Sequence, residues 1–168
     1  MRLSLLVFVL VFSCYTRAAE EVDVCELYFD KEDFCTYKGI TVKLLTTRIS
    51  FDEKILNSLV VINQGNKHSL SITKDTFMLE GDKGYIFFQD INFDGYPDIA
   101  ITTSFGLVNI FLDYWVYSTK NKQYVFVGNF SKLKLNNELK LLSNRIKINA
   151  AEYKNNTYTW QGLKLVMK

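Results

Sequence analysis

Proline, glycine and histidine are scarce in this chain of 168 residues, which contains one proline, eight glycines and one histidine. So few of these residues leave little room for interdomain linkers or low-complexity segments. No segment recurs with a period of 20–50 residues, so an architecture of repeated units is not indicated. The composition is 48% hydrophobic and 15% aromatic, which is too apolar for a disordered protein. These features predict one folded domain, which a chain of this length can support.

No strong charge of one sign is present either, because the formal net charge of the full chain is only +2. Such a protein has no global basic field with which to attract nucleic acid, so we expect no nucleic-acid partner. The charges are nonetheless unevenly distributed, since residues 20–35 hold seven acids against one base and residues 120–147 hold seven bases against one acid. An acidic flank can attract a basic partner, although such asymmetry more commonly reflects a solvated face.

Residues 1–18 have the anatomy of a secretory signal peptide. Arg2 is followed by an apolar run at residues 3–12 and then by small residues. The run is too short to cross a bilayer, because crossing requires roughly 20 apolar residues. The segment therefore predicts export.

Two cleavage sites fit this segment. Cleavage after Ala18 would leave residues 19–168 as one soluble domain. Cleavage after Ser13 would instead leave Cys14 as the lipidated first residue, as in bacterial lipoproteins, and Tyr15 after it would favour the outer membrane of a Gram-negative species. Both alternatives stay open, and Cys14 is the only membrane anchor that we expect.

Cysteine is rare: the chain has three cysteines and no Cys-x-x-Cys redox motif. Processing removes or modifies Cys14, so Cys25 and Cys35 remain as a pair. An even number of thiols in an exported protein predicts a disulfide. In the chain-entropy model, closing a loop of about ten residues stabilises the folded state by roughly 2–3 kcal/mol.

After Cys35 the chain reads as short segments rich in β-branched and aromatic residues, separated by turn sequences such as QGNK and EGDKG. Only residues 51–59 show a weak helical pattern. The spacing predicts an all-β, single-domain antiparallel meander, arranged as a sandwich, a barrel or a propeller-like sheet. We expect strands at residues 39–49, 56–64, 68–73, 84–89, 98–103, 111–118, 123–130, 139–148, 156–160 and 163–167.

The stretch FFQDINFDGYPDIAITT places oxygen-bearing residues at positions 1, 3, 5, 7 and 9 of a loop between two predicted strands. Gly95 at position 6 permits the backbone reversal that turns the next carbonyl inward. Hard oxygen donors without sulfur or imidazole match Ca²⁺ and argue against zinc. The predicted ligands are the side chains of Asp90, Asn92, Asp94 and Asp98 and the carbonyl of Tyr96.

This loop is not an EF-hand, because position 12 is Ile101 and the flanking segments read as strands. An Asx-rich turn without an ion is the alternative interpretation. Nothing near the loop supplies acid–base chemistry, and the single histidine, His68, lies in a strand pattern far upstream. We therefore expect calcium to stabilise the scaffold, and we expect no enzymatic activity.

Three segments carry a resemblance to a known family: FQDINFDGYPDIAI, DYWVYSTKNKQYVFV and NAAEYKNNTYTWQGLKLVMK. Together they resemble the calcium-binding periplasmic immunity proteins that protect bacteria from lysozyme-like effectors injected by competitors. These proteins are relatives of periplasmic inhibitors of I-type lysozyme. The resemblance covers residues 84–168, although integrin-like (FG-GAP-like) propeller repeats share the calcium loop. It implies a propeller-like domain without catalysis in the periplasm of a Gram-negative bacterium.

The resemblance also implies that a loop between the last long strands enters the cleft of a glycan hydrolase. In this chain that loop is NAAEY, where Asn149 replaces a glycine of the family. Two alanines permit close backbone approach, and a tyrosine is a rigid anchor with a polar tip. The predicted partner-binding residues are Arg145, Ala150, Ala151, Glu152 and Tyr153.

Two other classes of function remain open. A calcium-stabilised envelope module for adhesion or assembly would have the same fold but a different partner. An enzyme is harder to assemble, because the chain has a single histidine and few acids that could pair outside the metal loop.

Overall fold

The computed structural model describes residues 23–31, 34–105 and 107–168. Both predicted cleavage sites and Cys14 lie outside the described residues. Within the described ranges the chain forms thirteen strands and no helix, and every pair of neighbouring strands is antiparallel. No helix in this part of the chain is long and apolar enough to cross a membrane. The prediction of an all-β antiparallel fold is confirmed.

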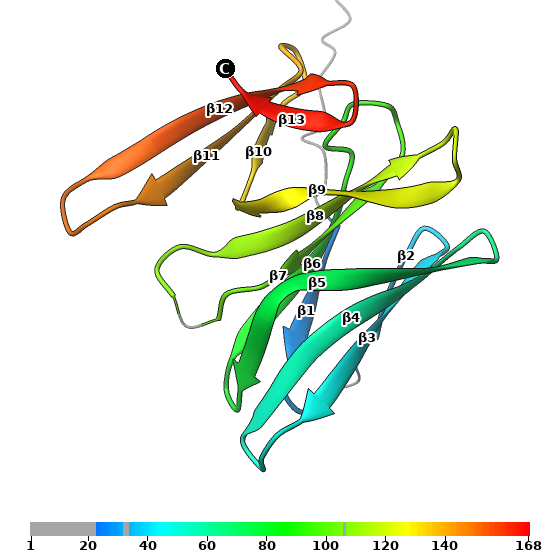
Figure 1. The fold of residues 1–168 in the computed structure, drawn as a ribbon, viewed down its shortest axis with the longest axis vertical. Helices are drawn as coiled ribbons and strands as arrows, with labels where there is room; N and C mark the ends of the chain where they lie inside the picture. The colour runs from blue at the N-terminus through cyan, green and yellow to red at the C-terminus, as the bar shows by residue number, and fades with distance from the viewer. Residues whose placement is uncertain (1–22, 32–33, 106) are drawn as a thin grey trace, which may run out of the picture.

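The strands form three sheets (Figure 1). The N-terminal sheet contains β2 (Phe34–Tyr37), β3 (Ile40–Arg48), β4 (Glu53–Asn63) and β5 (Asn66–Leu79), in that order. The central sheet has the order β1 (Asp23–Tyr28), β6 (Lys83–Gln89), β7 (Asp98–Thr102), β8 (Phe111–Ser118) and β9 (Gln123–Ser131). The C-terminal sheet contains β10 (Lys134–Asn136), β11 (Leu141–Lys147), β12 (Tyr153–Gln161) and β13 (Lys164–Met167). The described part of the chain is thus a meander, in which β1 and β6 are the one pair of neighbouring strands that are not consecutive in sequence.

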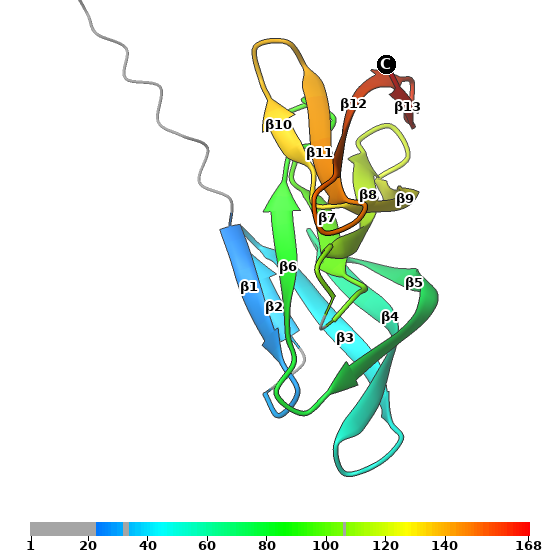
Figure 2. The same ribbon diagram turned by 90° about the vertical axis from the view of Figure 1, so that its left-hand side faces the viewer.

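The middle of the central sheet lies between the N-terminal and C-terminal sheets, as Figures 1 and 2 show from two sides. Successive side chains of a strand point to opposite faces, so alternate residues enter different cores. The core against the N-terminal sheet receives Ile86, Phe88, Ile99, Ile101, Trp115 and Tyr117. The core against the C-terminal sheet receives Phe87, Ala100, Tyr114 and Val116. Two cores explain why β7 and β8 are buried almost throughout.

The weak indication of a helix at residues 51–59 is wrong, because β4 occupies most of that segment. Lys54 and Leu56 are buried before a register shift, and Leu59 and Val61 are buried after it. The bulge reverses the inside–outside alternation, so two buried leucines stand three positions apart. That spacing imitates one face of a helix.

The predicted disulfide is present. It joins Cys25 of β1 to Cys35 of β2, with the two Cα atoms 6.1 Å apart. This separation lies within the usual range for a disulfide. The bond therefore links the central sheet directly to the N-terminal sheet.

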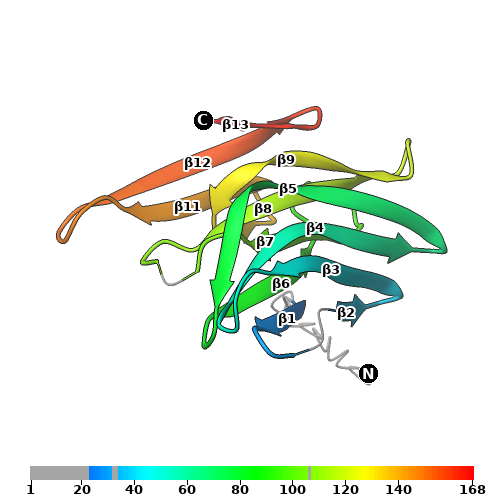
Figure 3. The same ribbon diagram turned by 60° about the horizontal axis from the view of Figure 1, so that its bottom comes forward.

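A large bulge in β5 is compensated by a buried carboxylate. Residues 72–75 of β5 lie opposite Asn57 alone, because the ladder resumes on either side of them. The backbone N–H of Thr73 donates instead to Oδ2 of Asp113, at 2.9 Å, and its hydroxyl donates to Oδ1 at 2.8 Å. The side-chain amide of Asn129 donates to the same Oδ1 at 2.7 Å. Asp113 is fully buried in β8, and β5 bends sharply on its way across the molecule (Figure 3).

Candidate functional site

The predicted metal loop connects β6 to β7 and curls around its own side-chain oxygens. Phe93 and Gly95 have φ values of 62° and 89°, in the left-handed region that reverses the chain. Asp90 accepts hydrogen bonds from the backbone N–H of Asp94 at 3.0 Å and of Gly95 at 2.7 Å. Asp94 accepts one from Tyr96 N–H at 3.0 Å. The glycine therefore performs the reversal expected of it, because a residue without a Cβ adopts this conformation freely.

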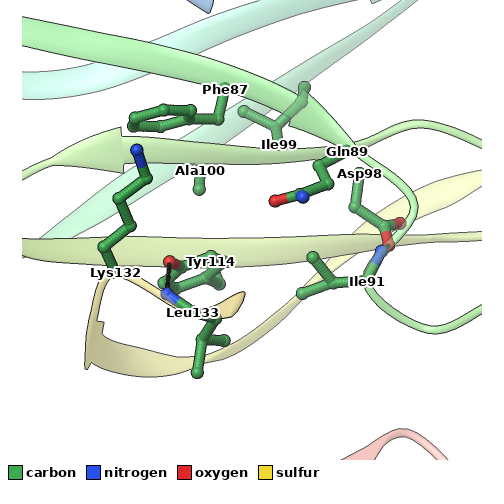
Figure 4. Close-up of a pocket in the computed structure, with 9 residues that line it drawn as sticks. All are labelled: Phe87, Gln89, Ile91, Asp98, Ile99, Ala100, Tyr114, Lys132 and Leu133. Carbon is green, nitrogen blue, oxygen red and sulfur yellow. Dashed lines mark hydrogen bonds between the residues drawn. The ribbon is translucent and has the colours of Figure 1, made fainter. Parts of the chain in front are cut away.

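Asp98 is placed differently from the other predicted ligands. It is buried, its Oδ2 accepts from the N–H of Ile91 at 2.9 Å, and its Oδ1 accepts from the N–H of Tyr117 at 2.8 Å. Figure 4 shows its carboxylate beside the backbone nitrogen of Ile91. Asp98 thus fastens the start of the loop to β8. The sequence spacing identified the residue but not this bracing role.

The loop concentrates negative charge. Burial raises the pKa of the Asp98 carboxyl well above its usual range, and the nearby charges of Asp90 and Asp94 raise it further. Hydrogen bonds from Tyr117 and Ile91 oppose this shift. Burial is also the main cause that raises the pKa of Asp90, with a smaller contribution from Asp94. A bound cation would relieve both the mutual repulsion and the cost of burying charge.

The donor chemistry of the loop fits Ca²⁺, but the described ranges contain no group of three or more Asp, Glu, His or Cys side chains arranged to hold a metal. The carboxylates instead accept hydrogen bonds from the loop's own N–H groups, as described above. Three carboxylates, one amide and a carbonyl are nonetheless the hard oxygen donors that Ca²⁺ prefers. The residues that could hold the ion are Asp90, Asn92, Asp94, Tyr96 through its carbonyl, and Asp98.

The same loop is tied to the C-terminal sheet. The indole N–H of Trp160 in β12 donates to the backbone carbonyl of Ile91 at 2.7 Å. Ile91 itself is almost fully buried. The sequence around Trp160 does not by itself indicate this contact. Its hydrogen bond now shows that the loop contacts both β8 and β12.

A small, partly open cavity lies beside the loop (Figure 4). It measures about 10 Å³ and is lined by Gln89, Asp98, Tyr114 and Lys132 together with apolar side chains. Such a space holds at most a single water molecule. This cavity therefore offers no site for an organic substrate.

The predicted partner-binding residues gather on the β11–β12 hairpin. Asn149 forms the turn, because its Oδ1 accepts from the N–H groups of Ala151 and Glu152, both at 3.0 Å. Its side-chain amide donates to Oε2 of Glu152 at 3.1 Å. Ala150 and Ala151 are exposed at the tip. The asparagine thus makes an Asx-type turn without needing a glycine.

Arg145 and Tyr153 form a pair beside this tip. The guanidinium carbon of Arg145 lies 3.9 Å from the centroid of the Tyr153 ring, within the range of a cation–π interaction. Both side chains are exposed. All five predicted partner-binding residues therefore share one exposed hairpin, away from the metal loop at the other end of β12.

Comparisons of this chain with protein-family models, with curated proteins and with solved structures found no match.

Proposed function

We propose that this chain is an exported calcium-binding inhibitor, an immunity protein that blocks a peptidoglycan-cleaving, lysozyme-like enzyme. The tip of the β11–β12 hairpin enters the substrate cleft of that enzyme. The observation that carries the proposal is the exposed, internally ordered tip with the Arg145–Tyr153 pair beside it. A tip that is already ordered loses little conformational entropy when it binds.

The hairpin matches the chemistry of a glycosidase cleft. Such clefts carry a pair of carboxylic acid side chains, which accept hydrogen bonds or ion pairs when ionised. The hydroxyl of Tyr153 and the guanidinium of Arg145 are donors for carboxylates. Stacking on the tyrosine ring keeps the arginine extended in a defined direction. The pair therefore offers a charged donor and a rigid aromatic anchor together.

In this proposal calcium is part of the scaffold. When bound, Ca²⁺ neutralises the clustered carboxylates and cross-links the loop between β6 and β7. Asp98 and Trp160 connect that loop to β8 and β12, so a stiffer loop also holds the base of the hairpin strand. In the same proposal the three consecutive antiparallel sheets act as a propeller-like array, which would expose the turns between strands for recognition.

The proposed place of action is the periplasm of a Gram-negative bacterium. Residues 1–18 direct export, and Cys14 anchors the protein to the outer membrane if cleavage occurs after Ser13. The support is the signal-like N-terminal sequence together with the Cys25–Cys35 disulfide, because such bonds persist in oxidising compartments.

Inhibition assays against a panel of purified C-, G- and I-type lysozymes test the proposal. The purified domain, residues 19–168, should slow the clearing of cell-wall suspensions by at least one of them. Tyr153→Ala should weaken inhibition about 10- to 100-fold, as expected for an aromatic anchor. Phe77→Ala is the matched control, because Phe77 and Tyr153 are 47% and 44% exposed and Phe77 lies in β5, outside both the hairpin and the metal loop.

Two outcomes would contradict the proposal. If the Tyr153→Ala variant inhibits as well as the unaltered protein, the hairpin has no part in the mechanism. Failure to inhibit any lysozyme would remove the inhibitor function. Binding to cell envelopes without inhibition would favour the adhesion or assembly module instead.

A further inference from the structure

The connection between β7 and β8 presents an apolar surface that is not part of the proposed plug, the tip of the β11–β12 hairpin that enters the cleft. Leu107, Val108 and Ile110 are all exposed, and Val108 is 77% exposed. Ile148 of the β11–β12 turn is exposed as well. Grouped exposed aliphatic side chains commonly mark a contact surface in a soluble protein.

Asn109 fixes this connection to the hairpin. Its side-chain amide donates to the carbonyl of Lys147 at 2.9 Å, and the N–H of Lys147 donates back to Oδ1 of Asn109 at 2.9 Å. The short strand β10 pairs with only residues 141–143 of β11, so it ends before Lys147. Asn109 therefore takes the place of a neighbouring strand at the distal edge of β11, where unpaired backbone groups would otherwise be exposed.

The two segments form one continuous surface. Val108, Ile148 and Ala150, with Lys147 and Asn149, surround an open hollow of about 270 Å³. Apolar side chains from segments about forty positions apart thus border the same depression. The β7–β8 connection therefore extends the exposed surface of the hairpin tip on the side of β11.

The charges around this surface indicate what it fits. Residues 141–161 contain Arg145, Lys147 and Lys154 against one acid, Glu152, a net charge of +2. The Glu152 carboxylate already accepts a hydrogen bond from Asn149. The segment 107–110 carries no charge. The complementary surface is therefore acidic where it meets the hairpin and apolar where it meets the β7–β8 connection.

We infer that residues 107–110 are a second contact segment, which Asn109 holds beside the hairpin, and that the two segments together dock on a protein with an acidic cleft and an apolar rim. This inference rests on the proposed function, in which the cleft belongs to a lysozyme-like enzyme. It adds that binding at the rim contributes to affinity independently of Tyr153. The apolar segment and the Arg145–Tyr153 pair then act on different parts of the same partner.

Two substitutions test separately the apolar contact made by residues 107–110 and the clamp, which is the pair of hydrogen bonds between Asn109 and Lys147. Val108→Asp places a negative charge on the apolar segment and should raise the inhibition constant for the lysozyme found in the panel about 10- to 100-fold. Asn109→Ala should raise it about 3- to 10-fold, because the segment must then be ordered on binding. It should also speed hydrogen exchange at the Lys147 amide, a readout that needs no partner. Circular dichroism verifies that each variant is folded.

Phe51→Asp is the matched control, because Phe51 is 79% exposed and should tolerate a charge equally well. It lies in the β3–β4 turn, which is at the bottom of Figure 1, whereas the β11–β12 hairpin projects at the left of the C-terminal sheet. Inhibition by Phe51→Asp should equal that of the unaltered protein.

The outcomes distinguish this inference from the proposed function. If Val108→Asp inhibits as well as Phe51→Asp while Tyr153→Ala is weakened, the second contact segment is overturned and the plug stands. If Lys147 exchange is unchanged in Asn109→Ala, the clamp is overturned. If the unaltered protein inhibits no lysozyme, the proposed function and the inference that rests on it both fail.

Discussion

Removing the carboxylate of Asp113 should unfasten the bulge of β5 from the central sheet. In Asp113→Ala, the side-chain amide of Asn129 loses one acceptor but keeps its bond to Oγ1 of Thr103, at 2.8 Å. The N–H of Thr73 loses its partner, and β4 cannot replace it because the ladder is interrupted there. The hydroxyl of Thr73 loses its acceptor as well. The substitution therefore removes one interaction inside the protein and two near its surface.

The magnitude follows from these three donors, the amide of Asn129 and the N–H and hydroxyl of Thr73. An unsatisfied buried donor costs about 1–3 kcal/mol, and water can replace part of the bond to Thr73, which lies close to solvent. We expect Asp113→Ala to lower the free energy of unfolding by about 2–4 kcal/mol. Asp113→Asn keeps one acceptor oxygen and should lower it by about 1–3 kcal/mol. Asp75→Ala, in the same bulge but exposed, should stay within about 0.5 kcal/mol of the unaltered protein.

Urea unfolding followed by tryptophan fluorescence measures these differences, because Trp115 is buried in the core between the central and N-terminal sheets. The midpoint should fall in Asp113→Ala while the slope of free energy against urea stays constant. If Asp113→Ala and Asp75→Ala unfold at the same urea concentration, the carboxylate does not compensate for the bulge. A changed slope would mean that the unfolding transition itself has changed.

Three further predictions concern the metal loop, the disulfide and a buried tyrosine. At a Ca²⁺ concentration about 100 times the dissociation constant, binding should add about 2.7 kcal/mol and raise the melting temperature by about 5–10 °C over a chelator. Asp94→Ala should abolish that rise, and an equal rise in both proteins would exclude the loop. Reduction of the Cys25–Cys35 disulfide should lower the free energy of unfolding by about 2–3 kcal/mol, as should replacing both cysteines with alanine. Burial raises the pKa of Tyr114 above its usual value of 10.0, so the unfolded chain ionises first and stability should fall as pH rises above 10. Tyr114→Phe, compared by urea midpoint on both sides of that pH, should lose part of this alkaline decrease; an unchanged decrease would contradict the assignment.

The sequence predicted the positions of most strands well, but it did not predict which strands pair with one another. Alternating apolar residues and turn sequences located most strands, because side-chain periodicity reports on one strand at a time. The pairing of β1 with β6 joins segments separated by the whole N-terminal sheet, and nothing in either segment identifies the other. The bulge in β4 could not be read either, because it reverses the alternation on which strand prediction depends.

The candidate sites show the same division. Spacing located the loop from Asp90 to Asp98, but it did not reveal that Asp98 is buried and bonded to three backbone N–H groups. Asp113 gave no signal, because a lone aspartate in an apolar strand reads as an exposed residue until its partners Thr73 and Asn129 are known. Burial and hydrogen-bond partners depend on which strands become neighbours. They therefore emerge only from the folded arrangement.

A central sheet whose middle strands β7 and β8 have no solvent face also limits where this protein can change during evolution. A new side chain in β7 or β8 must fit one of two filled interiors, so substitutions there are seldom neutral. The outer hairpins and connections have no such restriction, since most of their side chains meet only water. New recognition properties can accumulate at the edges of the molecule while the middle layer stays nearly fixed, as the proposed inhibitor of a changing enzyme would require.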